Sequence, residues 1–347
     1  MKKLLLLICL ALVVIVGIES FYIFSKNSPQ NPVIEKITPK PLLAYTFENL
    51  RKTTFPTTQI TLGAVVSQNS DYISQIFYYQ VPSKPGGSNL LKVSGLMNIP
   101  NKPGSFPVII MFRGFIPDNT YTPGAGTQPS ASIMAKNGFI TLAPDFLGYG
   151  TSASPSSDPF ENRFQTYTTA LTLLKSVKTL NGGLSKDYLA TISANLNKIG
   201  IWGHSNGGHI ALSTLAISGV NYPTVLWAPV SASFPYSIIY YTDESDDQGK
   251  ALRKTLSGFE DIYNTDLFDP AKYYSWIKAP MQINQGLSDV EVPYWWSDNL
   301  VLTLKKDGRD ITYITYPNSD HNLLPSGWND AVNNTITYFN SQFAKQK

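Results

Sequence analysis

The sequence is nearly free of cysteine and poor in histidine, and both shortages limit the chemistry open to it. Its one cysteine, Cys9, lies inside the first apolar run. The rest of the chain therefore offers no disulfide, no thiol nucleophile and no cysteine metal site. Three histidines among 347 residues also disfavour a histidine-based metal centre. The composition implies no metal and no cofactor.

Clustered positive charge is also missing. The formal net charge is +3, and no basic cluster follows Lys2 and Lys3. Because nucleic-acid binding proteins carry a basic patch or stripe, we expect no nucleic-acid partner.

The N-terminal segment predicts export or attachment to a membrane. Lys2 and Lys3 precede an apolar run over 4–18, which resumes over 21–24. Positive charge followed by apolar residues is typical of a signal segment, and the length also suits an uncleaved membrane anchor at 1–24. The upstream lysines favour an N-terminus inside the cell. We expect an anchored, extracytoplasmic protein, or a secreted one if the segment is cleaved.

The rest of the chain divides into a linker and one large domain. Residues 25–57 are rich in proline, which predicts a semi-extended linker. Residues 58–347 number about 300, enough for a single α/β domain. An aromatic-rich stretch over about 231–276 contains no strand pattern, and we expect a small helical cap there.

Within 58–347, strand and helix patterns alternate. We predict antiparallel first strands at 59–66, 72–81 and 90–99. We predict later strands at 106–112, which is a continuous apolar run, and at 139–143, 199–202, 224–228, 281–285 and 311–316. Between and after them we predict helices at 131–137, 159–180, 210–216, 294–306 and 326–343. This alternation predicts an α/β fold with a mostly parallel sheet and helices on both faces.

A serine stands at the turn between one of these strands and its helix. Residues 203–208 read Gly-His-Ser-Asn-Gly-Gly, with an apolar strand before them and an apolar helix after. This is the G-x-S-x-G pattern of a nucleophile elbow, in which a strained turn exposes the serine hydroxyl. Glycine supplies the room that such a tight turn requires. We predict that Ser205 is a nucleophile.

A serine nucleophile needs a base, and three histidines compete for the role. His204 adjoins Ser205 in the turn, so its side chain should diverge from the serine. His209 lies one turn into the following helix, and we expect a hydrogen-bonded structural residue. His321 follows the last strand, and loops after parallel strands meet at one edge of the sheet. We predict that His321 is the base.

The acid that orients the base should lie on the loop after the preceding strand. Asp289 occupies that loop, with Glu291 as the nearest rival, while Asp320 adjoins the histidine and reads as a solvated loop residue. The order Ser205, Asp289, His321 along the chain is that of α/β-hydrolases.

The negative oxygen of a tetrahedral intermediate needs fixed donors. We predict the backbone N–H of Asn206 as one donor and that of Gly114 or Phe115, after the 106–112 strand, as the other. Arg113 has two candidate roles. It is a candidate for binding a substrate carboxylate, or for pairing with a nearby acid to hold this loop.

These motifs resemble the α/β-hydrolase superfamily, and within it the prolyl-oligopeptidase catalytic domain and its esterase relatives. The resemblance covers about 59–345. Its carriers are residues 95–100, 144–150, 203–208 and 286–289, the pair Val292-Pro293, and His321. It implies a serine hydrolase that forms an acyl-enzyme from a small ester or a short peptide.

Two departures from the peptidase pattern favour an ester substrate, while peptides remain open. Arg113 stands near the place where many such peptidases use a tyrosine, and no segment before residue 90 is long enough for their β-propeller. The alternative is a catalytically inactive binding module with the same fold at the cell surface.

Overall fold

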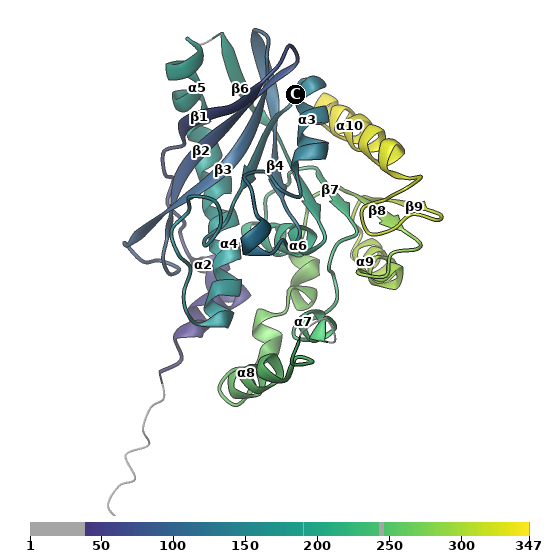
Figure 1. The fold of residues 1–347 in the computed structure, drawn as a ribbon. Helices are drawn as coiled ribbons and strands as arrows, with labels where there is room; N and C mark the ends of the chain where they lie inside the picture. Colours follow the sequence, from purple (N-terminus) through teal and green to yellow (C-terminus); the bar gives the residue numbers. More distant parts are fainter. Residues whose placement is uncertain (1–38, 190, 243–245, 347) are drawn as a thin grey trace, which may run out of the picture. The chain divides into compact units, whose positions relative to one another are not determined.

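A nine-stranded β-sheet runs through the part of the chain that the structure describes (Figure 1). This structure is a computed structural model, and it describes residues 39–189, 191–242 and 246–346. The predicted anchor or signal segment at 1–24 lies outside these ranges. Residues 25–38 of the predicted linker also lie outside them. Among the described residues, no helix combines the length and apolar character needed to cross a bilayer.

The sheet confirms the predicted mixture of strand directions. The strands are β1 (Thr61–Gln68), β2 (Tyr72–Pro82), β3 (Leu90–Pro100), β4 (Gly104–Phe112), β5 (Ile140–Pro144), β6 (Ile192–His204), β7 (Thr224–Trp227), β8 (Met281–Gly286) and β9 (Ile311–Tyr316). They are arranged in the order β1-β2-β3-β5-β4-β6-β7-β8-β9. Pairs up to β3–β5 are antiparallel, and every pair from β5–β4 onward is parallel. The carboxyl ends of β4 to β9 therefore share one edge.

Helices cover both faces of the parallel part, as its apolar strands require. Along β4, Val108, Ile110 and Phe112 join one core cluster, whereas Ile109 and Met111 join another. Alternate side chains of a strand point to opposite faces, so β4 is buried on both sides. This explains why its sequence is a continuous apolar run.

The helices divide between these two clusters. Residues of α3 (Gln128–Lys136) and α10 (Trp328–Lys345) pack in the cluster of Ile109. Residues of α4 (Pro159–Ser176), α6 (Asn206–Ser218) and α9 (Tyr294–Lys306) pack in the cluster of Ile110.

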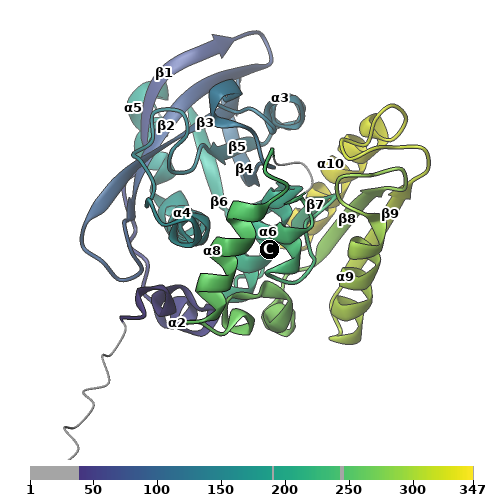
Figure 2. The same ribbon diagram turned by 60° about the horizontal axis from the view of Figure 1, so that its bottom comes forward.

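The stretch predicted as a cap is helical where it is described. It contains α7 (Tyr236–Ile239), α8 (Lys250–Glu260) and the 3-10 turns Thr265–Phe268 and Pro270–Trp276. Figure 2 shows α8 next to α4. Phe259 of α8 packs on Phe160 and Phe164 of α4 with ring centroids 4.4 and 6.2 Å apart. The ring of Phe259 therefore packs the cap against α4.

The boundary of the predicted linker needs correction. Residues 41–52 form a 3-10 turn (Pro41–Tyr45) and helix α2 (Phe47–Lys52) that belong to the folded body. Tyr45, Phe47 and Leu50 are buried, and the ring of Phe47 stacks on Tyr273 at 4.8 Å. The proline content predicted an extended segment. Burial of these apolar side chains is instead favourable in free energy, and it holds the segment against the domain.

Helix α5 (Leu180–Tyr188) was also not predicted as a separate element. Its adjacent Gly182 and Gly183 lower helix propensity and obscure the pattern. Gly183 lies against β1, where an added Cβ would come within 2.9 Å of the carbonyl oxygen of Ile60. Close packing against the sheet explains the glycine.

Candidate active site

Ser205 occupies a strained turn between the end of β6 and the start of α6, as the motif predicts. Its backbone has φ 56° and ψ −123°, a conformation that non-glycine residues rarely adopt. Four backbone hydrogen bonds hold the turn. The Ser205 N–H donates to Trp227 (3.0 Å), and the Ser205 carbonyl accepts from Gly208 (2.9 Å), His209 (3.4 Å) and Val230 (3.0 Å). The surrounding structure thus imposes the conformation.

Asp289 and His321 form a buried pair. Asp289 Oδ2 lies 2.9 Å from His321 Nδ1. Both residues are buried, with 7 % and 5 % of their surface exposed. A carboxylate only accepts hydrogen bonds, so Nδ1 carries the proton. In the neutral ring, Nε2 is then free to accept a proton, as a general base must.

The carboxylate of Asp289 is held from several sides. Its Oδ1 accepts from the N–H groups of Glu291 (2.9 Å) and Val292 (2.8 Å), and its Oδ2 accepts from Gln285 Nε2 (3.1 Å). These donors fix the orientation of the carboxylate.

The two rival acids are placed differently. The side chain of Glu291 is 61 % exposed, and its Oε2 lies 3.8 Å from His321 Nε2. The carboxylate of Asp320 accepts from the backbone N–H groups of Asn322 and Leu324, which shapes the loop that carries His321. Of the three acids, Asp289 is the one bonded to Nδ1.

The loop that carries His321 lies against the turn of Ser205, and His204 makes the contact. His204 Nε2 donates to the carbonyl of His321 at 3.0 Å, and the two rings lie 4.6 Å apart. Sequence reasoning missed this contact, which only the juxtaposition of β6 and β9 loops reveals. The Ser205 hydroxyl is partly exposed, and it forms no hydrogen bond with His321 within the described ranges. Catalytic hydrogen bonds of this kind often tighten only when substrate binds.

The low pKa of His204 predicts that the protein loses stability in acid. Burial, together with the charge of His321, lowers the pKa of His204 from 6.5 to about 4. The unfolded chain therefore takes up a proton at 204 below pH 6.5, which the folded chain resists down to about pH 4. Stability from this group is complete above pH 6.5 and is lost as the pH falls.

We expect wild type to lose about 3 kcal/mol of unfolding free energy relative to His204→Gln between pH 7 and pH 4. Urea denaturation of both proteins across this range measures the difference. Comparison with the variant cancels the opposite contributions of Asp145 and Asp269, whose pKa values burial raises. A difference that does not change with pH would contradict the assignment.

His209 is the structural residue that the sequence predicts. It is buried, with 1 % of its surface exposed, and its Nε2 lies 2.7 Å from the Tyr167 hydroxyl. Burial and then the Arg163 charge hold the pKa of His209 well below 6.5, so the ring is neutral.

The loop after β4 reaches the serine. A Cβ built on Gly114 would lie 3.0 Å from the Cβ of Ser205 and 3.5 Å from its Oγ. Asn206 is the first residue of α6, so its N–H has no acceptor within the helix and lies at the positive end of the helix dipole. Phe115 is 75 % exposed and lines the adjacent cavity with Asn206. Of the predicted donors, Gly114 and Asn206 thus lie next to Ser205.

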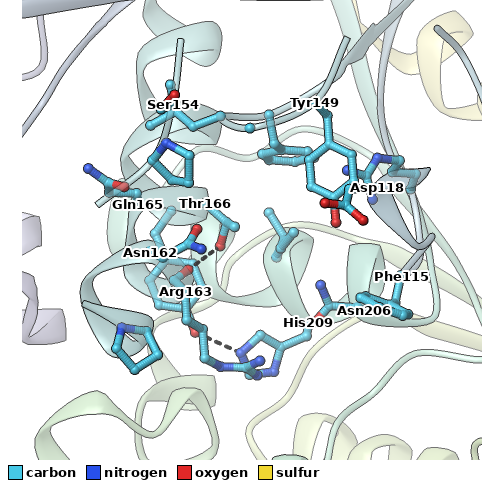
Figure 3. Close-up of a pocket in the computed structure, with 18 of the residues that line it drawn as sticks. Phe115, Asp118, Tyr149, Ser154, Asn162, Arg163, Gln165, Thr166, Asn206 and His209 are labelled. Carbon is cyan, nitrogen blue, oxygen red and sulfur yellow. Dashed lines mark hydrogen bonds between the residues drawn. The ribbon is translucent and has the colours of Figure 1, made fainter. Parts of the chain in front are cut away.

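A cavity of about 720 Å³ opens beside this loop (Figure 3). Phe115 and Asn206 line it next to the serine, and Asn162, Arg163 and Thr166 of α4 line it from another side. Its volume suits a small organic ligand.

Arg113 also borders the cavity, but its guanidinium is engaged. It donates to the carbonyls of Gly114 (3.0 Å) and Asp145 (3.1 Å), and it lies 4.0 Å from the ring centre of Tyr149 and 4.8 Å from that of Tyr121. Only 7 % of the residue is exposed. These contacts favour the second of its two candidate roles, that of holding the oxyanion loop, over substrate binding.

Comparison with known families and structures agrees with this arrangement. The Prolyl oligopeptidase family matches residues 185–346, and the Chlorophyllase family matches residues 83–228. Each of these matches covers less than half of the chain, and together with the sheet they support the α/β-hydrolase fold. The Prolyl oligopeptidase match covers the elbow, Asp289 and His321, and it supports assignment of the chain as a serine hydrolase. No curated protein sequence matched significantly.

Solved structures share the α/β-hydrolase fold at low identity. An acetyl xylan esterase from Paenibacillus sp. R4 is 16 % identical with a TM-score of 0.56, over 88 % of this chain and 96 % of that one. The rice cell wall degrading esterase LipA from Xanthomonas oryzae is 12 % identical with a TM-score of 0.51, over 85 % and 99 %. The acylaminoacyl peptidase of Pyrococcus horikoshii is 15 % identical with a TM-score of 0.50, over 83 % of this chain and 50 % of that one.

Proposed function

We propose that this α/β-hydrolase cleaves its substrate through an acyl-enzyme formed on Ser205. The observation that carries the proposal is the buried Asp289–His321 pair, whose loop packs against the strained turn of Ser205. In the proposed reaction, Ser205 Oγ attacks the substrate carbonyl while His321 Nε2 accepts its proton. Asp289 holds the Nδ1–H and stabilises the imidazolium that forms.

The remaining steps use the same groups. The N–H of Asn206 and one from Gly114 or Phe115 bind the oxyanion, and the protonated His321 then gives its proton to the leaving group. Water then attacks the acyl carbonyl and gives a proton to His321. The C–O bond to Ser205 breaks, His321 returns the proton to Ser205 Oγ, and the carboxylic acid is released.

Carboxylic esters are the proposed substrate class, with short peptides as the second candidate. An alkoxide leaves more readily than an amine anion, so an ester needs less assistance from the loop that Arg113 holds. The cavity beside Asn206 is large enough for a small ester. We also propose an extracytoplasmic location, which rests on the charge and apolar pattern of the N-terminal sequence.

A fluorophosphonate probe tests the nucleophile directly. The serine oxygen displaces fluoride from phosphorus, and the protein retains the labelled phosphonyl group. We expect the wild-type protein to be labelled, Ser205→Ala to remain unlabelled, and Ser213→Ala to be labelled like wild type. Equal labelling of wild type and Ser205→Ala would refute the assignment, and absence of labelling in wild type would favour the inactive binding module.

A further inference from the structure

The cavity beside the oxyanion loop contains a second arginine, and its surroundings differ from those of Arg113. Arg163 projects from α4 into the cavity lining, near His209 (Figure 3). Within the described ranges it forms no ion pair with an aspartate or glutamate. Its Nε is buried and has no hydrogen-bond partner. The guanidinium charge is therefore left without a compensating anion.

The acid nearest to Arg163 along the chain does not neutralise it. Glu161 accepts hydrogen bonds from Ser156 at 2.6 Å and Tyr45 at 3.1 Å, and its carboxylate lies 3.9 Å from Lys84. Among the described residues that line the cavity, Asp118 is the one carboxylate, and it is exposed and not paired with Arg163.

Tyr167 and His209, two neighbours of Arg163, add no negative charge. Burial raises the pKa of the Tyr167 hydroxyl, against the opposing effect of Arg163, and so keeps it neutral. His209 is neutral as well, and its Nε2 shares the hydrogen bond with Tyr167. A partly buried cation without a counter-ion is unfavourable, and a carboxylate from outside would supply both the charge and the planar pair of acceptors that a guanidinium binds best.

We propose that Arg163 binds a carboxylate of the substrate, so that the preferred esters carry a free acid group away from the bond that is cleaved. This inference rests on the proposed function, because Arg163 lines the same cavity as Asn206, the residue that follows Ser205. Carboxylate binding was one of the two roles that the sequence left open for Arg113, and we assign it to Arg163 instead.

Matched fluorophosphonates test the proposal without knowledge of the natural substrate. The two probes of a pair share the same alkyl chain, which ends in a carboxylate in one probe and in the isosteric carboxamide in the other. Across the series the chain has four to eight carbons. Both probes label Ser205 by loss of fluoride, and the second-order rate constant of labelling is measured on the full-length protein. We expect the carboxylate probe to react at least 10-fold faster at the best chain length. The preference should fall about 10- to 100-fold in Arg163→Met.

Two further variants separate charge from structure. Lys175→Met removes one positive charge from an exposed position of the same helix, and it should keep the preference of wild type. Arg163→Lys should retain part of it, since the charge remains without the planar fork. Carboxamide labelling should stay within about threefold of wild type in all three variants.

The outcomes distinguish the two proposals. If neither probe labels Ser205, the proposed function fails and the inference fails with it. If the carboxamide probe labels Ser205 but the carboxylate preference is absent, or persists in Arg163→Met, the nucleophile stands and the role of Arg163 is refuted.

Discussion

Replacing Asp289 by asparagine is expected to lower kcat by about 10⁴ while the fold survives. The surroundings of Asp289 determine which way the new amide points. Two backbone N–H groups face Oδ1, so the amide oxygen takes that side. The amide nitrogen must then face His321 and donate to Nδ1. This forces the ring proton onto Nε2, where the ring can no longer accept a proton from Ser205.

The measurement is steady-state hydrolysis of p-nitrophenyl esters of graded chain length, with circular dichroism to verify folding. Glu291→Gln is the matched control, because it makes the same change on the rival acid two residues away. We expect it to alter kcat less than 10-fold, since the Glu291 side chain is largely exposed. A loss in Glu291→Gln that equals the loss in Asp289→Asn would show that the acid is misassigned.

Gly207→Ala is expected to cost about 3 kcal/mol or more of unfolding free energy and most of the activity. An added Cβ would overlap the carbonyl of Phe112 and would lie 2.7 Å from the carbonyl oxygen of Arg113. Both neighbours are backbone atoms, so no side-chain rotation relieves the clash. Either α6 or the end of β4 must move, and these two elements carry the serine and the oxyanion loop.

Thermal and urea denaturation measure this loss, with Gly258→Ala as the control. Gly258 is exposed in α8, and an added Cβ there meets no atom within 4 Å. We expect that variant to gain about 0.5–1 kcal/mol, because alanine restricts the unfolded chain and favours the helix. A Gly207→Ala protein as stable and active as wild type would mean that the elbow is packed less closely than described.

Most of the sheet could be predicted from sequence because its strands are continuous apolar runs. Strands β5 and β7 are buried along their whole length, and β4 is a buried apolar run from Val108 to Phe112. The start of α4 was equally readable, since Asp158 accepts from the N–H groups of Phe160 and Glu161 as an N-cap should.

The pairing of Asp289 with His321 followed from chain order and from the shared edge of parallel strands. The role of Arg113 did not follow, because its partners are backbone carbonyls and tyrosine rings that no spacing reveals. The sequence also did not indicate a role for Arg163. Its distinguishing feature is that no acid among the described residues pairs with it, and this is a property of the folded chain.

The helix at residues 47–52 has a practical consequence for anyone who prepares a shorter version of this protein. Arg51 donates to the carbonyl of Ala216 near the end of α6, and its guanidinium lies 4.5 Å from the ring centre of Trp276. The Arg51 side chain thus contacts both α6, the helix that follows Ser205, and Trp276, the last residue of the cap. Trimming up to residue 58 would remove these contacts, so a recombinant fragment should begin at or before residue 41.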